Sequence, residues 1–91
     1  MNKDSKHLLK RHQALTQSDN VKVLSHVQRE EGDWIKHTLM IESADVPFVF
    51  RRKQHYKSLT GARVNLTYYP SQQDVAGIPF EFMKVVRLRR S

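Results

Sequence analysis

The residues in this sequence best suited to chemistry are cationic side chains with a tyrosine among them, all in the second half of the chain. They are Arg51, Arg52, Lys53, Lys57, Arg63, Tyr69, Arg87 and Arg89. Guanidinium and ammonium groups pair with phosphate oxygens, and an aromatic ring can stack on an unpaired base. These residue types predict binding of RNA or single-stranded DNA, with the cations as phosphate contacts and Tyr69 as a stacking platform.

The charge distribution favours a polyanionic ligand. Residues 1–45 carry seven Lys or Arg and seven Asp or Glu, so their charges cancel. Residues 46–91 carry nine Lys or Arg against Asp74 and Glu81, so the whole net charge of +7 lies there. Such polarisation attracts phosphate backbones, although net charge also serves solubility. We expect the cations to converge on one surface when the strands come together.

Catalytic and metal chemistry find little support in the sequence. It has no Gly-x-Ser-x-Gly elbow, phosphate-binding glycine loop, His-Glu-x-x-His or paired-carboxylate signature, so no enzyme and no catalytic residue are predicted. The absence of cysteine excludes disulfides and thiolate sites. His26 and His37 lie on neighbouring expected strands and could approach each other, but no third ligand is indicated. We therefore predict no metal site and no cofactor.

Five segments alternate apolar and polar residues with period two, which predicts β-strands at 21–29, 34–42, 46–50, 62–69 and 80–89. The clearest of them begins after Gly61 and ends at Pro70. The residues of this strand that are expected to face the core are Ala62, Val64, Leu66 and Tyr68. In the second strand one face consists of Ile35, His37, Leu39 and Ile41. In the first strand the alternation places on one face Val21, Val23, Ser25 and Val27. The adjacent Val85 and Val86 predict a β-bulge in the last strand.

The segments between these strands have other patterns. Residues 1–19 predict a short helical extension, and residues 51–60 predict a helical turn capped by Gly61. The acidic run 30–33 predicts a hairpin loop, and residues 70–79, rich in Ser, Gln, Gly and Pro, predict a longer loop. A chain of 91 residues builds one modest core, so residues 20–91 are expected to form a single domain.

The order of three strands, a helical crossing and two strands resembles the five-stranded OB-fold barrel over roughly residues 20–90; an SH3-like barrel also fits. The resemblance makes the first and fourth strands neighbours. It implies a ligand lying across the second and third strands and the loops 1–2 and 4–5. Those loops contain Glu30, Glu31, Asp33 and Asp74, which would repel phosphates. On the second strand, Trp34 beside Lys36 is the stacking candidate.

The alternative function is a protein-interaction or adaptor domain. Exposed apolar residues could form its interface, namely Trp34, Met40, Val49, Met83 and Val85. Every apolar run is far shorter than the roughly 18 residues that span a bilayer, so no membrane association is expected. A cytoplasmic location is the default expectation, and the sequence does not indicate an oligomeric state.

Overall fold

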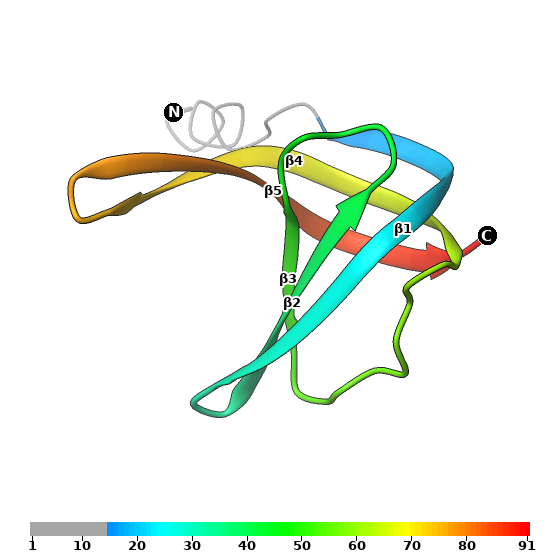
Figure 1. The fold of residues 1–91 in the computed structure, drawn as a ribbon, viewed down its shortest axis with the longest axis horizontal. Helices are drawn as coiled ribbons and strands as arrows, with labels where there is room; N and C mark the ends of the chain where they lie inside the picture. Colours follow the sequence, from blue (N-terminus) through cyan, green and yellow to red (C-terminus); the bar gives the residue numbers. More distant parts are fainter. Residues whose placement is uncertain (1–14) are drawn as a thin grey trace, which may run out of the picture.

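Five strands close into a barrel in the computed structural model, which describes residues 15–91 (Figure 1). The strands are β1 (Thr16–Glu31), β2 (Trp34–Ile41), β3 (Phe48–Arg52), β4 (Arg63–Val75) and β5 (Ile78–Arg90). Their order around the barrel is β1-β2-β3-β5-β4, with β4 paired to β1. Only the β3–β5 pair is parallel. The predictions of a mainly β, five-stranded barrel with neighbouring first and fourth strands are confirmed.

Strand β1 closes the barrel because it pairs with two different strands along its length. Its first part, through Lys22, pairs with β4, and its second part, from Val23, pairs with β2. The irregular register between Ser18 and Val21 contains Asn20, whose φ of 57° bends the chain. Asn adopts this left-handed conformation more readily than most residues.

The alternating residues of β2 and β4 supply much of the core, as predicted. The β2 side chains Ile35, His37, Leu39 and Ile41 are all buried, and in β4 Val64 and Leu66 are fully buried. Leu39, Ile41, Val64 and Leu66 pack with Phe48 and Phe50 of β3 inside the barrel, and His37 stacks on Phe50. Burial of each large apolar side chain contributes roughly 1.5–3 kcal/mol, so these strands supply much of the driving force for folding.

Two bulges shift which side chains face inward. In β5, Tyr68 pairs with Val85 while Thr67 pairs with Arg87, so Val86 is the extra residue and the predicted bulge is confirmed. In β1, Leu24 is the extra residue. The inward face of β1 therefore changes parity, and Val27 is 48% exposed. The predicted grouping of Val27 with Val23 on one face is wrong for this reason.

The part of the chain that the structure describes contains no helix, and hence none long and apolar enough to cross a membrane. The predicted helical turn at 51–60 is wrong, because residues up to Arg52 belong to β3 and the following loop bonds to the barrel. The Gly61 N–H donates to the Val23 carbonyl at 2.8 Å, and the Tyr56 N–H donates to the Gln28 side chain at 2.9 Å. Donors bonded to the barrel cannot complete helical turns.

The predicted N-terminal helix lies mostly outside the described residues, at 1–14. Its remaining part is not helical, because β1 begins at Thr16 and pairs with Tyr68. Pairing with a neighbouring strand satisfies the backbone groups of Thr16 and the next residues, which a short isolated helix would satisfy only marginally.

Strands β4 and β5 continue beyond the barrel as a long hairpin, which projects away from the body in Figure 1. The predicted loop at 70–79 is wrong, since pairing extends to Val75 and Ile78. Ala76 and Gly77, with φ of 52° and 82°, make a two-residue turn of the kind that suits the twist of hairpins. Pro70 is tolerated within β4 because the pairing of β1 with β4 reaches only Tyr68, leaving an edge.

Candidate nucleic-acid interface

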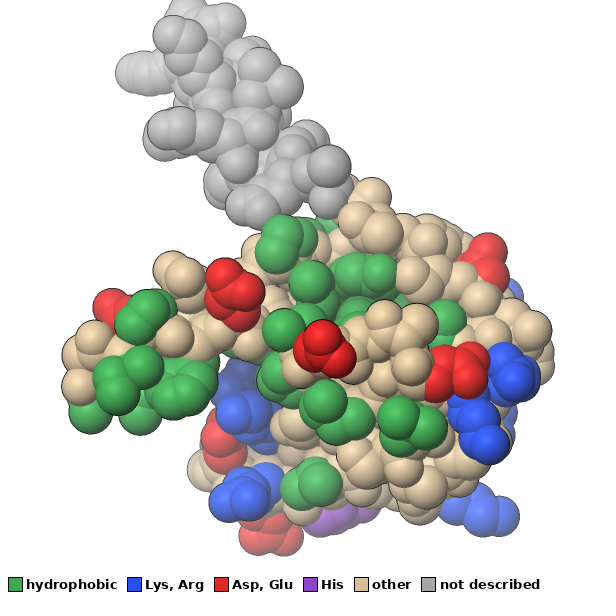
Figure 2. Space-filling view, turned by 45° about the horizontal axis from the view of Figure 1, so that its top comes forward, with side chains coloured by type: hydrophobic (Ala, Val, Ile, Leu, Met, Phe, Trp, Pro, Cys, Tyr) green, Lys and Arg blue, Asp and Glu red, His purple; other side chains and the backbone are tan. Residues whose placement is uncertain are grey.

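A groove of about 290 Å³ lies between the β4–β5 hairpin and the outer face of β2 and β3. The barrel contributes Lys36, Val49 and Arg51, and the hairpin contributes Phe80 and Phe82. Figure 2 shows hydrophobic side chains over the projecting hairpin and Lys or Arg side chains in the angle between it and the barrel. The groove therefore combines aromatic rings with two cations and with the carboxylate of Glu81, which also lines it.

The register of the sheet brings the cations of the groove together from three strands. Lys36 of β2 pairs with Arg51 of β3, and Val49 of β3 pairs with Lys84 of β5. Arg51 and Lys84 also line a second recess of about 180 Å³ that shares Phe82 with the first. We call these two connected hollows the basic groove, lined by Lys36, Val49, Arg51, Phe80, Phe82 and Lys84.

The floor of the basic groove is made by the outer face of β3. The consecutive residues Phe48, Val49 and Phe50 are all buried. Successive side chains of a strand point to opposite faces, so both faces of β3 are covered here. Phe48 and Phe50 belong to the core, so Val49 points outward and is covered, to 6% exposure, from outside the barrel. The hairpin thus packs over β3 and gives the groove an apolar floor.

Three of the predicted contacts, Arg51, Arg52 and Lys53, lie at or beside this groove. The Arg51 guanidinium forms an ion pair with Glu31 at 3.1 Å, and both side chains are more than 40% exposed. The Arg52 guanidinium lies 5.0 Å from the centre of the Phe50 ring. The Lys53 ammonium lies 4.5 Å from the centre of the Trp34 ring, which is itself 45% exposed. Exposed pairs of this kind are weak and can exchange for a phosphate.

Tyr69, Arg87 and Arg89 continue the surface along the outside of β4 and β5. Tyr69 pairs with Lys84, and the two arginines pair with Thr67 and Asn65. Their inward neighbours Val85 and Leu88 pack in the core, so alternation places the arginines on the outer face with Lys84. We call Tyr69, Arg87 and Arg89 the β5 strip, which begins where the basic groove ends.

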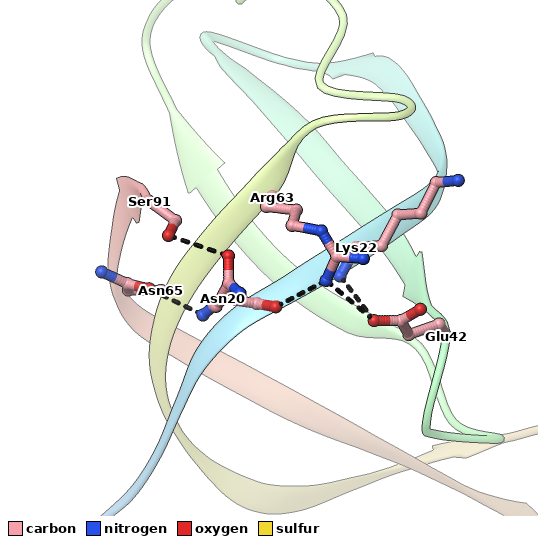
Figure 3. A network of polar contacts seen from close by, with 6 residues as sticks. All are labelled: Asn20, Lys22, Glu42, Arg63, Asn65 and Ser91. Atoms are coloured by element: carbon pink, nitrogen blue, oxygen red, sulfur yellow. Dashed lines mark hydrogen bonds and ion pairs between the residues drawn. The ribbon is translucent and has the colours of Figure 1, made fainter.

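Arg63 is held in a polar network at the far end of this strip (Figure 3). Its guanidinium donates to the Asn20 carbonyl at 2.9 Å and to Glu42 at 3.3 Å. Glu42 also accepts from the Lys22 backbone N–H, and Asn65 accepts from that of Asn20. Arg63 therefore joins β4 to β1 and to the residue after β2, and Glu42 offsets its charge.

The structure thus arranges seven of the eight predicted residues along a path and does not gather them in one cluster. Arg51 and Arg52 line the groove and Lys53 lies over Trp34 beside it. Tyr69, Arg87 and Arg89 form the strip, and Arg63 lies at its end. Lys57 is exposed on the loop between β3 and β4 and belongs to no strand, so no pairing connects it to the groove or the strip. The expected convergence on a single surface holds for the groove and the strip alone.

Sequence reasoning did not select Lys36, Lys84, Phe80 and Phe82. The predicted bulge offered a signal, because counting back from buried Val85 places Met83 inward and Phe82 and Lys84 outward. The place of Lys36 in the groove could be predicted only from the pairing register, which puts Lys36 opposite Arg51. Of the acids expected to repel phosphate, Glu31 pairs with Arg51, and Glu30 lies 3.7 Å from His55, which carries charge only when protonated.

Residues 15–91 contain no cluster of three or more His, Asp or Glu side chains able to hold a metal ion. His26 and His37 do approach each other as predicted, with ring nitrogens 2.9 Å apart. Comparisons with protein-family models, with curated proteins and with solved structures find no match to this chain. The site must therefore be interpreted from its own geometry.

Proposed function

We propose that this protein is a non-enzymatic module that binds RNA or single-stranded DNA, and that its barrel is OB-like. The observation that carries the proposal is the basic groove, where Lys36 and Arg51 line one hollow with Phe80 and Phe82, and Arg51 and Lys84 line the adjoining hollow with Phe82. In OB-like binders the ligand lies on the second and third strands, beside the 4–5 connection. The basic groove occupies the corresponding place in this barrel.

The chemistry of the groove suits a single strand. Cations neutralise phosphates along the path of the backbone, while bases stack on exposed aromatic rings without strong sequence preference. A duplex would hide its base faces from these rings, and the described residues offer no helix for a major groove. The β5 strip extends the same combination of charge and aromatic surface, so a longer oligonucleotide would pass from the groove over Tyr69 and Arg87.

The test is a fluorescence anisotropy titration of the whole chain with a labelled, unstructured oligonucleotide over a series of salt concentrations. On single strands log K falls with a slope of roughly 0.7 per neutralised phosphate, so contacts from three groove cations predict a slope of about 2. The variant Lys84→Gln should reduce both affinity and slope. Lys22→Gln is the matched control, because it removes the same charge from exposed β1, outside the groove.

Absence of binding at low salt would refute the nucleic-acid proposal, and so would equal losses in Lys84→Gln and Lys22→Gln. Preference for duplex over single strands would refute the stacking component. A short duplex of the same composition should accordingly be titrated in parallel, since it presents similar phosphates without accessible base faces.

A second candidate, a protein-interaction domain, is favoured by the end of the hairpin. Val75, Ile78 and Phe80 are 48–56% exposed there, an apolar surface of the kind found at interfaces. A pull-down would then return a protein partner after nuclease treatment, and Ile78→Ser would abolish the capture while Arg89→Gln would not. Oligonucleotide binding that depends on Lys84 would instead favour the first candidate.

A further inference from the structure

A chain of hydrogen bonds through two histidines connects the barrel to the loop 53–62. The Leu59 N–H donates to His26 Nδ1 at 3.0 Å, and His26 Nε2 lies 2.9 Å from His37 Nδ1. His37 Nε2 in turn lies 3.1 Å from the Gln54 carbonyl oxygen. His37 is fully buried, and Leu59 is nearly so. The two histidines thus hold both ends of the loop, at Gln54 and at Leu59.

The partners at the two ends determine where the protons lie. A backbone N–H can only donate, so His26 Nδ1 must accept and the His26 proton is on Nε2. That Nε2–H must donate to His37 Nδ1, which leaves the His37 proton on Nε2. A carbonyl oxygen can only accept, and Gln54 completes the chain. Both rings are therefore neutral, each with its proton on Nε2.

We propose that this chain of bonds is an acid-sensitive lock, which holds the loop 53–62 against the end of the barrel only while both histidines are neutral. A proton added to His26 Nδ1 would point at the Leu59 N–H. A proton added to His37 Nδ1 would point at the Nε2–H of His26. Either protonation places two donors face to face. The first breaks the bond between His26 and Leu59 of the loop, and the second breaks the bond between the two rings that fixes the His26 proton on Nε2.

The surroundings of the two rings also disfavour the charged form. Burial, followed by the neighbouring His37, lowers the pKa of His26. Burial lowers the pKa of His37 as well, and the positive Arg52 of β3 and His55 of the loop act in the same direction, while the bond to Gln54 opposes them. The acid Glu30 of β1 lies beside His55. The other neighbours are the rings of Phe50 and Tyr56.

The sign of the pH dependence follows from these contacts. In the open loop both histidines titrate near the ordinary value of about 6.5, whereas in the closed loop they resist protonation. The closed loop is therefore fully favoured above about pH 6.5, and acid favours the open form because that form binds more protons. For each proton taken up, the population of the open form should rise about tenfold per pH unit below 6.5.

The experiment uses NMR on the whole chain. Nitrogen-15 spectra of the imidazoles at about pH 7.5 should show both rings protonated on Nε2 alone. Amide exchange of Leu59, corrected for the intrinsic effect of pH, should show constant protection above pH 6.5 and falling protection toward about pH 5. Neither measurement involves a nucleic acid, so the outcome is independent of the proposed function.

Two variants distinguish the lock from a general effect of acid. His55→Gln removes an exposed histidine of the same loop that lies outside the chain of bonds; its charge is the last of the influences on His37, so most of the loss of Leu59 protection should remain. His26→Asn keeps an acceptor near the Leu59 N–H without a titrating ring, so the dependence should shrink to that of one proton at most. A ring protonated on Nδ1, pH-independent protection, or loss of the dependence in His55→Gln would overturn the proposal. The ring spectra decide the matter even if His26→Asn does not fold.

Discussion

Single residues decide which side chains meet in this barrel, and Leu24 is the clearest case. As the extra residue of β1 it reverses the parity of the strand, which brings His26 against His37 and leaves Val27 half exposed. Adjacent apolar residues also stand at Val23 and Leu24, so the sequence held a local signal for this reversal that the predicted alternation did not use. In β5 the doubled Val85 and Val86 did predict a bulge, because two adjacent apolar residues cannot both face the core.

At the residue scale, Phe82 should stack on a base of the ligand. Phe82→Leu retains an apolar side chain over the groove but removes the ring. We expect affinity for a single strand to fall by about 1–3 kcal/mol, the usual contribution of base–aromatic stacking. Anisotropy titration measures the loss, and a thermal melt checks the fold. Val86→Ala, on the outside of β5, should leave affinity unchanged; a similar loss there would contradict the assignment.

Glu31 should act as an internal competitor of the phosphate. Its carboxylate pairs with Arg51 in the groove, so Glu31→Gln frees the arginine and should increase affinity and steepen the salt dependence. The fold should lose no more than about 1 kcal/mol, since exposed pairs contribute little. Glu42→Gln frees Arg63 in the same way and provides the comparison. Equal or lower affinity in Glu31→Gln would remove Arg51 from the site.

At the scale of elements, alternation predicted β2 and the inner part of β4 almost to the residue. It did not predict the loop 53–62, where Tyr56 and Leu59 fitted a helical turn. Their backbone N–H groups donate to the side chains of Gln28 and His26 in β1, which local sequence does not reveal. The hairpin was missed because its Ser, Gln, Gly and Pro residues are typical of loops. Pairing of Gln73 with Phe80 and of Val75 with Ile78 overrides that composition.

Gly61 and Gly77 should differ in how their replacement affects the fold. Both have positive φ, and a β-carbon would meet nothing within 4 Å at either position, so alanine costs backbone conformation alone. Gly61 donates to β1 beside buried Leu59, and Gly61→Ala should lower the free energy of unfolding by about 1–2 kcal/mol in urea. Gly77→Ala, at the hairpin tip, should alter unfolding less. Equal effects would mean that the hairpin unfolds with the barrel.

For the whole molecule, we infer that the barrel supplies the folding core and that the hairpin contributes to the proposed binding. The core lies within the barrel, whereas the projecting part of β4 and β5 carries exposed apolar residues and one wall of the groove. Candidate binding residues could be chosen from charge and residue type alone. Their arrangement along a path, with Lys57 apart, depended on pairing between distant strands.

Replacing residues 72–81 by an Asn-Gly turn should separate the two roles. The new turn would connect Ser71 to Phe82, which pair with each other two residues closer to the barrel than Gln73 and Phe80. Pairs two residues apart have the same hydrogen-bonding type, so Ser71 with Phe82 suits a two-residue turn as Val75 with Ile78 does. We expect the shortened chain to fold, by circular dichroism and thermal melting, and to bind a single strand markedly less tightly. Full affinity in the shortened chain would exclude the hairpin from the site.

The divided pairing of β1 also has a kinetic consequence. Its early residues meet β4 far along the chain, as in the bond between Ser18 and Tyr68, which are separated by 50 positions. During synthesis β1 therefore has its hairpin partner β2 available early, whereas its β4 partner follows 50 positions later. Barrel closure that depends on contacts between distant residues is slow. We therefore expect β1 and β2 to pair early, and the pairing of β1 with β4 to limit the rate of folding.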